Sequence, residues 1–272
     1  MGTNPKPIYG VDISVFPGLT AMEWLRKNAN VRFACFYLGP TDNHGDPSWM
    51  NRRTALAVTG WGMIPTYVGQ QAHVKKANVL VPNPELNAAR GTKDGGEACN
   101  LMTVAGFALG SIVYLDLEEG DQPTGPYQAY IIAWIEAVKA RSFVPAIYCP
   151  GGAAHWALGY ARIVWLAAPD NLDSKGRPIP AVLDTKRLPV PSSGKGFVAV
   201  QFKWEIEFSG LDQPADGNHG PRFDLNTGIV ADPSDFAAVD RALNDLAEAK
   251  EETADLQLWS VAREALDQGS IP

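Results

Sequence analysis

Two carboxylic acids stand two residues apart, Asp116 and Glu118, at the end of a run that is otherwise apolar and β-prone from residue 112. Such an uncharged run is typical of a parallel strand buried on both faces. Because side chains alternate along a strand, the two carboxyl groups point the same way, with α-carbons roughly 6.6 Å apart. Mutual repulsion and desolvation then raise the pKa of at least one of them. A protonated acid beside an ionised partner suits glycoside hydrolysis. A strand end that runs into a solvated acidic loop, with Glu119 and Asp121 following, stays open as the alternative.

Two further acids occupy comparable places. Asp12 ends the first strand-like run, Tyr9-Gly10-Val11-Asp12-Ile13-Ser14, and Asp224 lies in Arg222-Phe223-Asp224-Leu225-Asn226. Taken singly, Asp12 could cap a turn and Asp224 could be a turn residue. Their relation to Asp116 and Glu118 depends on the elements that carry them.

Strand-like and helix-like segments alternate along most of the chain. The expected strands are 8–14, 32–39, 63–69, 111–118, 144–149, 163–168, 197–204 and 223–225. The expected helices are 21–29, 48–59, 94–109, 127–142, 153–158 and 234–266. Residues 71–92, 170–196 and 209–221 are polar or rich in Pro and Gly, and are expected to form loops.

This alternation predicts parallel strands with right-handed crossovers. About eight strands in about 250 residues indicate a TIM-like (β/α) barrel, whose active groups lie at the carboxyl ends of the strands. We expect residues 1–248 to form the barrel, less regular in its last third, and 249–272 to form a C-terminal helical extension. A doubly wound open sheet is the alternative, but residues 10–14 do not form the Gly-rich phosphate turn that it would need.

A barrel would bring the acids together. Strand ends meet around one mouth, and the first strand of a closed barrel is the neighbour of the last. Asp12 and Asp224 should therefore lie close to each other, and Asp116 and Glu118 should face the same cavity. Four carboxylates from three strands would form one candidate site.

Composition excludes several classes of partner and cofactor. The chain has 272 residues and a formal net charge of -7 with scattered Lys and Arg, so no nucleic-acid footprint is expected. No stretch approaches the roughly 20 apolar residues of a membrane span. Cysteine and histidine spacings match no disulfide framework and no metal site, so we expect buried thiols, no metal and no cofactor. These residues are Cys35, Cys99, Cys149, His44, His73, His155 and His219.

The order of the motifs resembles glycoside hydrolase family 25, the lysozymes that cleave peptidoglycan. Residues 9–14 resemble the Gly-x-Asp-Val-Ser opening of that family, 114–118 its Asp-x-Glu strand, and 223–226 its closing Val-Asp-x-Asn. Val200-Gln201-Phe202 is similar to its Trp-Gln-Tyr strand. The section 60–71 looks closer to a sister group on the same barrel, the glycoside-hydrolase-like domain of unknown function family 1906. The resemblance spans roughly residues 8–230.

The resemblance implies roles for the acids. Glu118 would protonate the glycosidic oxygen, and Asp116 would stay ionised, either stabilising the oxocarbenium-like centre or orienting a substrate acetamido group. Asp12 and Asp224 would hold Asp116, position water or bind sugar hydroxyls. Retention and inversion both stay open. Candidate sugar-binding residues at or near strand ends are Tyr37, Tyr67, Tyr148, Gln201 and Trp204. The aromatic ones could equally be core or rim packing.

The resulting hypothesis is a muramidase-like enzyme that cleaves β-1,4 bonds of peptidoglycan-type, N-acetylated glycans. A non-catalytic glycan-binding barrel and a glycosidase for another polysaccharide are the alternatives. Residues 1–7 lack the basic and apolar regions of a secretory signal. We therefore expect synthesis in the cytoplasm, with release or injection if the target is a cell wall, as for a phage-type lysin or a delivered effector. A docking partner for the C-terminal helix stays open.

Overall fold

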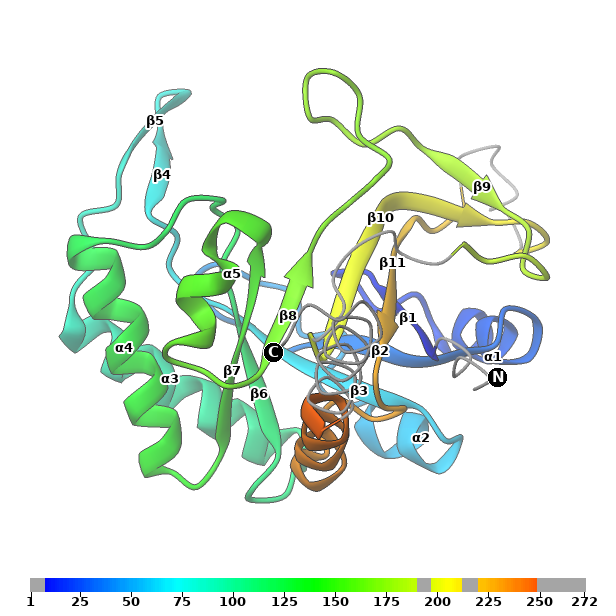
Figure 1. The fold of residues 1–272 in the computed structure, drawn as a ribbon, viewed down its shortest axis with the longest axis horizontal. Coiled ribbons are helices and arrows are strands. Elements are labelled where there is room, and N and C mark those ends of the chain that lie inside the picture. Colours follow the sequence, from blue (N-terminus) through cyan, green and yellow to red (C-terminus); the bar gives the residue numbers. More distant parts are fainter. Residues whose placement is uncertain (1–7, 190–196, 212–219, 249–272) are drawn as a thin grey trace, which may run out of the picture.

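The computed structural model describes residues 8–189, 197–211 and 220–248, and in it eight strands close a barrel (Figure 1). Around the barrel the strands follow the order β11-β1-β2-β3-β6-β7-β8-β10, and β10 pairs back with β11. Their bounds are β1 Ile8–Asp12, β2 Val31–Tyr37, β3 Gly62–Val68, β6 Ile112–Asp116, β7 Val144–Pro150, β8 Val164–Ala167, β10 Ala199–Phe208 and β11 Phe223–Gly228. A short strand, β9 (Ala181–Leu183), pairs with the far end of β10. The predicted TIM-like α/β barrel is confirmed.

The last strand runs against the others. β11 is antiparallel to both β1 and β10, whereas β1 to β10 pair in parallel around the barrel. The expectation of parallel strands is wrong for β11, which lies in the last third of the chain, where we expected the barrel to be less regular. The sequence between β10 and β11 is rich in Pro and Gly, a composition that favours a chain reversal over a crossover helix. Asp224 consequently lies near the start of β11. Its α-carbon is paired with that of Asp12, at the same end of the barrel.

Helices surround the barrel, and most lie where the sequence predicts them. They are α1 Leu19–Asn28, α2 Arg53–Val58, α3 Ala88–Val104, α4 Gly125–Ala140 and α5 Gly151–Leu158, and residues 236–248 are also helical. α3 starts six residues earlier than expected, because the Asn87 side chain caps it by accepting from the Arg90 backbone N–H. The prediction of a helical extension over 249–272 falls outside the described residues.

The expected loop 71–92 contains a hairpin instead. β4 (His73–Lys76) pairs with β5 (Val79–Pro82), and the hairpin projects beyond the barrel beside the ends of the neighbouring strands (Figure 1). Its two turn residues, Ala77 and Asn78, both have positive φ, as a tight type I′ turn requires. The four-residue strands are mostly exposed, so they leave only a weak hydrophobic pattern in the sequence.

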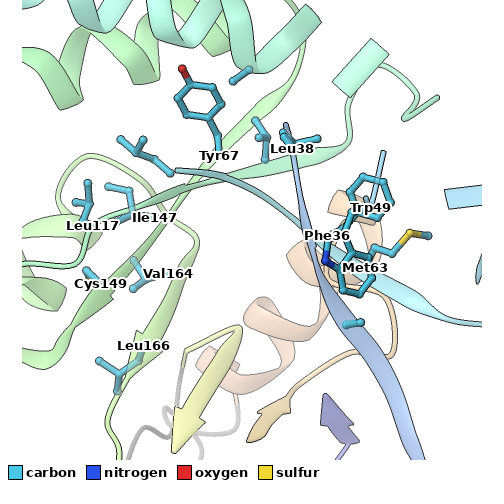
Figure 2. Packing of buried hydrophobic residues seen from close by; sticks show 14 of the residues in the cluster. Phe36, Leu38, Trp49, Met63, Tyr67, Leu117, Ile147, Cys149, Val164 and Leu166 are labelled. Atoms are coloured by element: carbon cyan, nitrogen blue, oxygen red, sulfur yellow. The ribbon is translucent and has the colours of Figure 1, made fainter. Parts of the chain in front are cut away.

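Alternation along the strands separates two cores. Inward residues such as Phe33, Ile64 and Tyr114 fill the barrel. Outward residues pack between the barrel and its helices, and Figure 2 shows part of this outer core, including Phe36, Trp49, Met63, Tyr67 and Ile147. Both faces of the central strands are thus apolar, as expected of buried parallel strands.

Candidate active site

A cavity of about 230 Å³ opens at the barrel end where the parallel strands finish. It is lined by all four predicted acids, Asp12, Asp116, Glu118 and Asp224, together with Glu205. The other lining residues are Tyr37, Thr66, Tyr148, Trp165, Pro178, Gln201 and Trp204. None of these lining residues is a lysine, arginine or histidine, so no cation from them neutralises the carboxylates.

Burial and mutual repulsion act most strongly on Asp116. It is 5% exposed, and its Oδ1 has no hydrogen-bond partner within the described part of the chain. Burial raises the pKa of Asp116 well above its usual range, and the charges of Glu118 and Asp12 raise it further. The pocket therefore destabilises the ionised form of Asp116.

Asp12 and Asp224 form a second pair at the strands β1 and β11. Burial raises the pKa of Asp12 to about 6, although the Tyr37 hydroxyl, the Cys35 thiol and the Gln201 amide oppose the rise. Burial, followed by the charge of Asp12, raises the pKa of Asp224 to about 8. The Asp224 Oδ1 also accepts a 2.8 Å hydrogen bond from the Glu205 backbone N–H, which lies at an irregular position of β10.

Glu118 differs from the other three because it lies beyond the end of β6 and reaches solvent at the pocket rim. Even so, the protein atoms packed around its carboxyl group raise its pKa above the ordinary value. An acid with a raised pKa and access to the pocket can hold a proton and pass it to a bound molecule.

Gln201 connects the acids to the aromatic wall of the pocket. Its Oε1 accepts hydrogen bonds from the Tyr148 hydroxyl at 2.7 Å and from the Trp204 Nε1 at 2.6 Å. The indole N–H can only donate, so the amide oxygen must face it. The amide nitrogen is thereby directed to Asp12, whose Oδ2 lies 2.8 Å away.

Of the five predicted sugar-binding residues, the structure places four at the pocket: Tyr37, Tyr148, Gln201 and Trp204. The Tyr148 ring packs against Trp165, with centroids 4.4 Å apart.

Tyr67 does not line the pocket, and this part of the prediction is corrected. Figure 2 shows its ring turned outward, toward the helices. There its hydroxyl donates to Glu97 at 2.7 Å, and the ring lies near Trp134. The neighbouring residue Thr66 faces inward instead, because adjacent residues of a strand point to opposite sides. β3 is buried on both faces, so its sequence gave no sign of which side faces the pocket.

Several pocket residues were missed by sequence reasoning, namely Thr66, Trp165, Pro178 and Glu205. Trp165 belongs to a predicted strand and could have been found from its inward parity. Pro178 and Glu205 lie on a connecting segment and at a strand irregularity, which local sequence patterns do not place. Within the described residues no group of three or more His, Cys, Asp or Glu side chains has a geometry that could hold a metal ion.

Comparison with known proteins decides the family. The model of a family described as "Rv2525c-like, glycoside hydrolase-like domain" matches residues 23–186, which is more than half of the chain. The chain belongs to this family. The resemblance predicted from the motifs is confirmed. The match includes Asp116 and Glu118, whereas Asp12 and Asp224 lie outside the matched residues.

Solved structures with the same fold come from bacteria and a phage. A protein of B. stearothermophilus described as uncharacterized has 16% identity and a TM-score of 0.52 over 81% of this chain and 95% of that one. The catalytic domain of endolysin ply40 from bacteriophage P40 of Listeria monocytogenes has 11% identity and a TM-score of 0.53 over 89% and 99%. The modular autolysin LytC from Streptococcus pneumoniae has 12% identity and a TM-score of 0.54 over 84% and 47%. No curated protein sequence matches significantly.

No helix in the described part of the chain combines the length and the apolar character that a membrane span requires.

Proposed function

We propose that this protein is a glycoside hydrolase that cleaves β-1,4 bonds of peptidoglycan-type, N-acetylated glycans, in the manner of a muramidase. The observation that carries the proposal is the meeting of Asp12, Asp116, Glu118 and Asp224 in one cavity without a lining cation. Carboxylates held together in this way destabilise one another. A purely structural pocket gains nothing from them, whereas acid catalysis requires raised pKa values.

Glu118 is the proposed general acid. It lies at the pocket rim with a raised pKa, so it can protonate the glycosidic oxygen of a sugar that enters the cavity. The Tyr148 and Trp204 rings line the same cavity, and a sugar could stack on them. A cavity of about 230 Å³ is smaller than the pockets that enclose drug-sized ligands, and suits one ring of a longer chain.

Asp116 is the proposed stabilising carboxylate, and its role depends on substrate. Burial and the neighbouring acids raise its pKa and so oppose the ionised form that the motif resemblance implied. A donor placed against the unpartnered Oδ1, such as the N–H of a substrate acetamido group, favours the ionised form and lowers the pKa. Binding of an N-acetylated sugar would thus stabilise the ionised carboxylate of Asp116, which could then orient the acetamido group.

The neighbours are consistent with this substrate class. The ply40 structure is that of an endolysin catalytic domain, and LytC, an autolysin, has been solved with a synthetic peptidoglycan ligand. At 11–12% identity these structures share the fold with the chain, and the choice of substrate rests on the site.

Digestion of purified peptidoglycan tests the proposal, with new reducing ends counted and products weighed by mass spectrometry. The wild-type protein is expected to release muropeptides. Glu118→Gln and Asp116→Asn should each lower the rate by at least about 100-fold, because general acid catalysis contributes that much or more. Both variants should melt at or above the wild-type temperature, since each replaces a group whose charge is unfavourable in the pocket.

A matched control is Glu136→Gln, which changes an exposed glutamate on α4 and should leave the rate unchanged. Retained hydrolysis in both pocket variants would contradict the assignment of Glu118 and Asp116 as catalytic groups. Binding of peptidoglycan without new reducing ends would favour a non-catalytic glycan-binding barrel. Cleavage of another polysaccharide but not of peptidoglycan would favour a glycosidase with that polysaccharide as its substrate.

A further inference from the structure

β6 ends at Asp116, before Glu118, yet the backbone of both residues makes hydrogen bonds on the β3 side. β6 pairs with β3 through Thr66↔Tyr114, Tyr67↔Leu115 and Val68↔Asp116, and the ladder stops where β3 ends, at Val68. On the other side, the Leu117 N–H donates to the Tyr148 carbonyl of β7 at 3.0 Å. The next N–H on the β3 side, that of Glu118, therefore needs a partner from outside this ladder.

The side-chain amide of Gln71 is that partner. Its Nε2 donates to the Asp116 carbonyl at 2.9 Å, and its Oε1 accepts from the Glu118 N–H at 3.0 Å. In a parallel ladder, one residue donates to the carbonyl before its opposite residue and accepts from the N–H after it. Gln71 reproduces this pattern with Leu117 as the opposite residue, so one amide side chain replaces one peptide group of β3.

Gln71 is itself fixed by neighbours from outside the barrel. Its Oε1 also accepts from the Tyr127 hydroxyl at 3.2 Å, which sets the orientation of the amide. Its carbonyl oxygen accepts from Asn83 Nδ2 at 3.0 Å, and the same nitrogen donates to Gln70 Oε1. The Gln70 N–H donates to the Tyr130 hydroxyl, at 3.0 Å.

This support continues into α3. The Tyr130 hydroxyl donates to the buried Asp94 at 2.9 Å, and Asp94 also accepts from Arg90 at 2.7 Å. Helices α3 and α4 thus hold the segment 70–71 by hydrogen bonds that do not reach the pocket.

We propose that Gln71 is a positioning residue, which extends the β3–β6 ladder by one step and so keeps Asp116 and Glu118 on the face that lines the pocket. This inference rests on the proposed function for its catalytic consequence. Without the amide, the Asp116 carbonyl and the Glu118 N–H each lose a hydrogen bond on the β3 side. Glu118, already at the rim, can then turn toward solvent.

Two substitutions test it. Gln71→Met keeps the length of the side chain and removes both hydrogen bonds, so kcat should fall about 10- to 100-fold, as expected of a displaced catalytic group, with KM within about 2-fold of wild type. Gln71→Glu keeps an acceptor and loses the donor when ionised, but a protonated carboxyl group can supply both. The activity of this variant relative to wild type should therefore rise as the pH falls, whereas the ratio for Gln71→Met should stay flat. Gln128→Met, on the outer surface of α4, is the matched control and should behave as wild type.

A second readout does not depend on hydrolysis. Carbon-13 NMR of the glutamate carboxyl groups, assigned with Glu118→Gln, should show the Glu118 titration in Gln71→Met moved down toward the ordinary glutamate value. If the wild-type protein hydrolyses no glycan but the titration moves, the positioning role stands and the proposed function fails. Unchanged kcat, a flat pH ratio for Gln71→Glu, or a variant that only melts earlier with Glu118 titrating as in wild type would overturn the inference.

Discussion

The carboxyl groups that serve the proposed chemistry also lower the stability of the folded protein when they are ionised, and Asp224 is an example. Asp224 has an ordinary pKa near 3.8 when unfolded and about 8 when folded, because of burial and the charge of Asp12. The folded protein therefore binds this proton more tightly than the unfolded chain does. Folding stability that depends on Asp224 is largest below pH 4 and declines as the pH rises toward 8.

Asp224→Asn should remove this decline. The amide oxygen can still accept the hydrogen bond from the Glu205 N–H, but no charge develops at high pH. We expect the variant and the wild type to unfold alike at pH 4, and the variant to be more stable by roughly 1–3 kcal/mol at pH 8. Urea denaturation at both pH values measures the difference.

The control is Asp121→Asn, which changes an exposed acid outside the pocket and should alter stability little and equally at both pH values. Parallel stability curves for Asp224→Asn and wild type between pH 4 and pH 8 would show that Asp224 titrates normally.

The sequence predicted the four acids of the pocket well and the other pocket residues less well. Asp12, Asp116, Glu118 and Asp224 could be found because acids at the ends of apolar strands are conspicuous. The sequence could not show whether Thr66 or Tyr67 faces the pocket, since a strand that is buried on both faces is apolar on both. Nothing in the sequence indicated a role for Gln71, because its side-chain amide forms hydrogen bonds with backbone atoms of a segment more than forty residues away.

Inside the barrel, β1 and β2 are in close contact through Gly10 and Phe33. The Phe33 ring of β2 lies over Gly10 of β1, where an added Cβ would fall 2.0 Å from the ring. Gly228 of β11 lies on another side of the same ring, with a corresponding distance of 2.9 Å. Phe33 thus fills the barrel interior because two neighbouring strands present glycine to it.

Gly10→Ala should therefore destabilise the barrel by about 1–3 kcal/mol, the usual cost of overpacking. Chemical denaturation measures the loss. Adding Phe33→Leu should recover part of it by making room for the methyl group. Gly45→Ala, at a position with no atom within 4 Å of the added carbon, should have little effect. Equal stability of Gly10→Ala and Gly45→Ala would contradict the packing account.

Element identity was largely predictable, whereas strand direction was not. The eight barrel strands follow from apolar runs, but the antiparallel course of β11 follows from its pairing with β1 and β10, which local sequence patterns do not show. The β4–β5 hairpin was missed because its strands are short and exposed, and the early start of α3 because Asn87 was not recognised as its cap.

Across the whole molecule, two segments project beyond the end of the barrel that carries the pocket. The β4–β5 hairpin stands on one side of the barrel end and the β8–β9 connection with β9 on the other (Figure 1). The hairpin is joined to the end of β6 through His73, whose N–H donates to Glu119 at 2.7 Å. A glycan that crosses the barrel end would place one ring in the cavity and its neighbours near these segments.

A structure of the Glu118→Gln variant with a bound N-acetylated tetrasaccharide tests the central claim, that the four acids serve one glycosidic bond. The account predicts one sugar ring in the cavity beside Tyr148 and Trp204, with the glycosidic oxygen within about 3 Å of the amide at position 118. It also predicts the acetamido N–H directed at Asp116. A tetrasaccharide bound with its glycosidic oxygens far from position 118, or an empty cavity at saturating saccharide, would contradict the account.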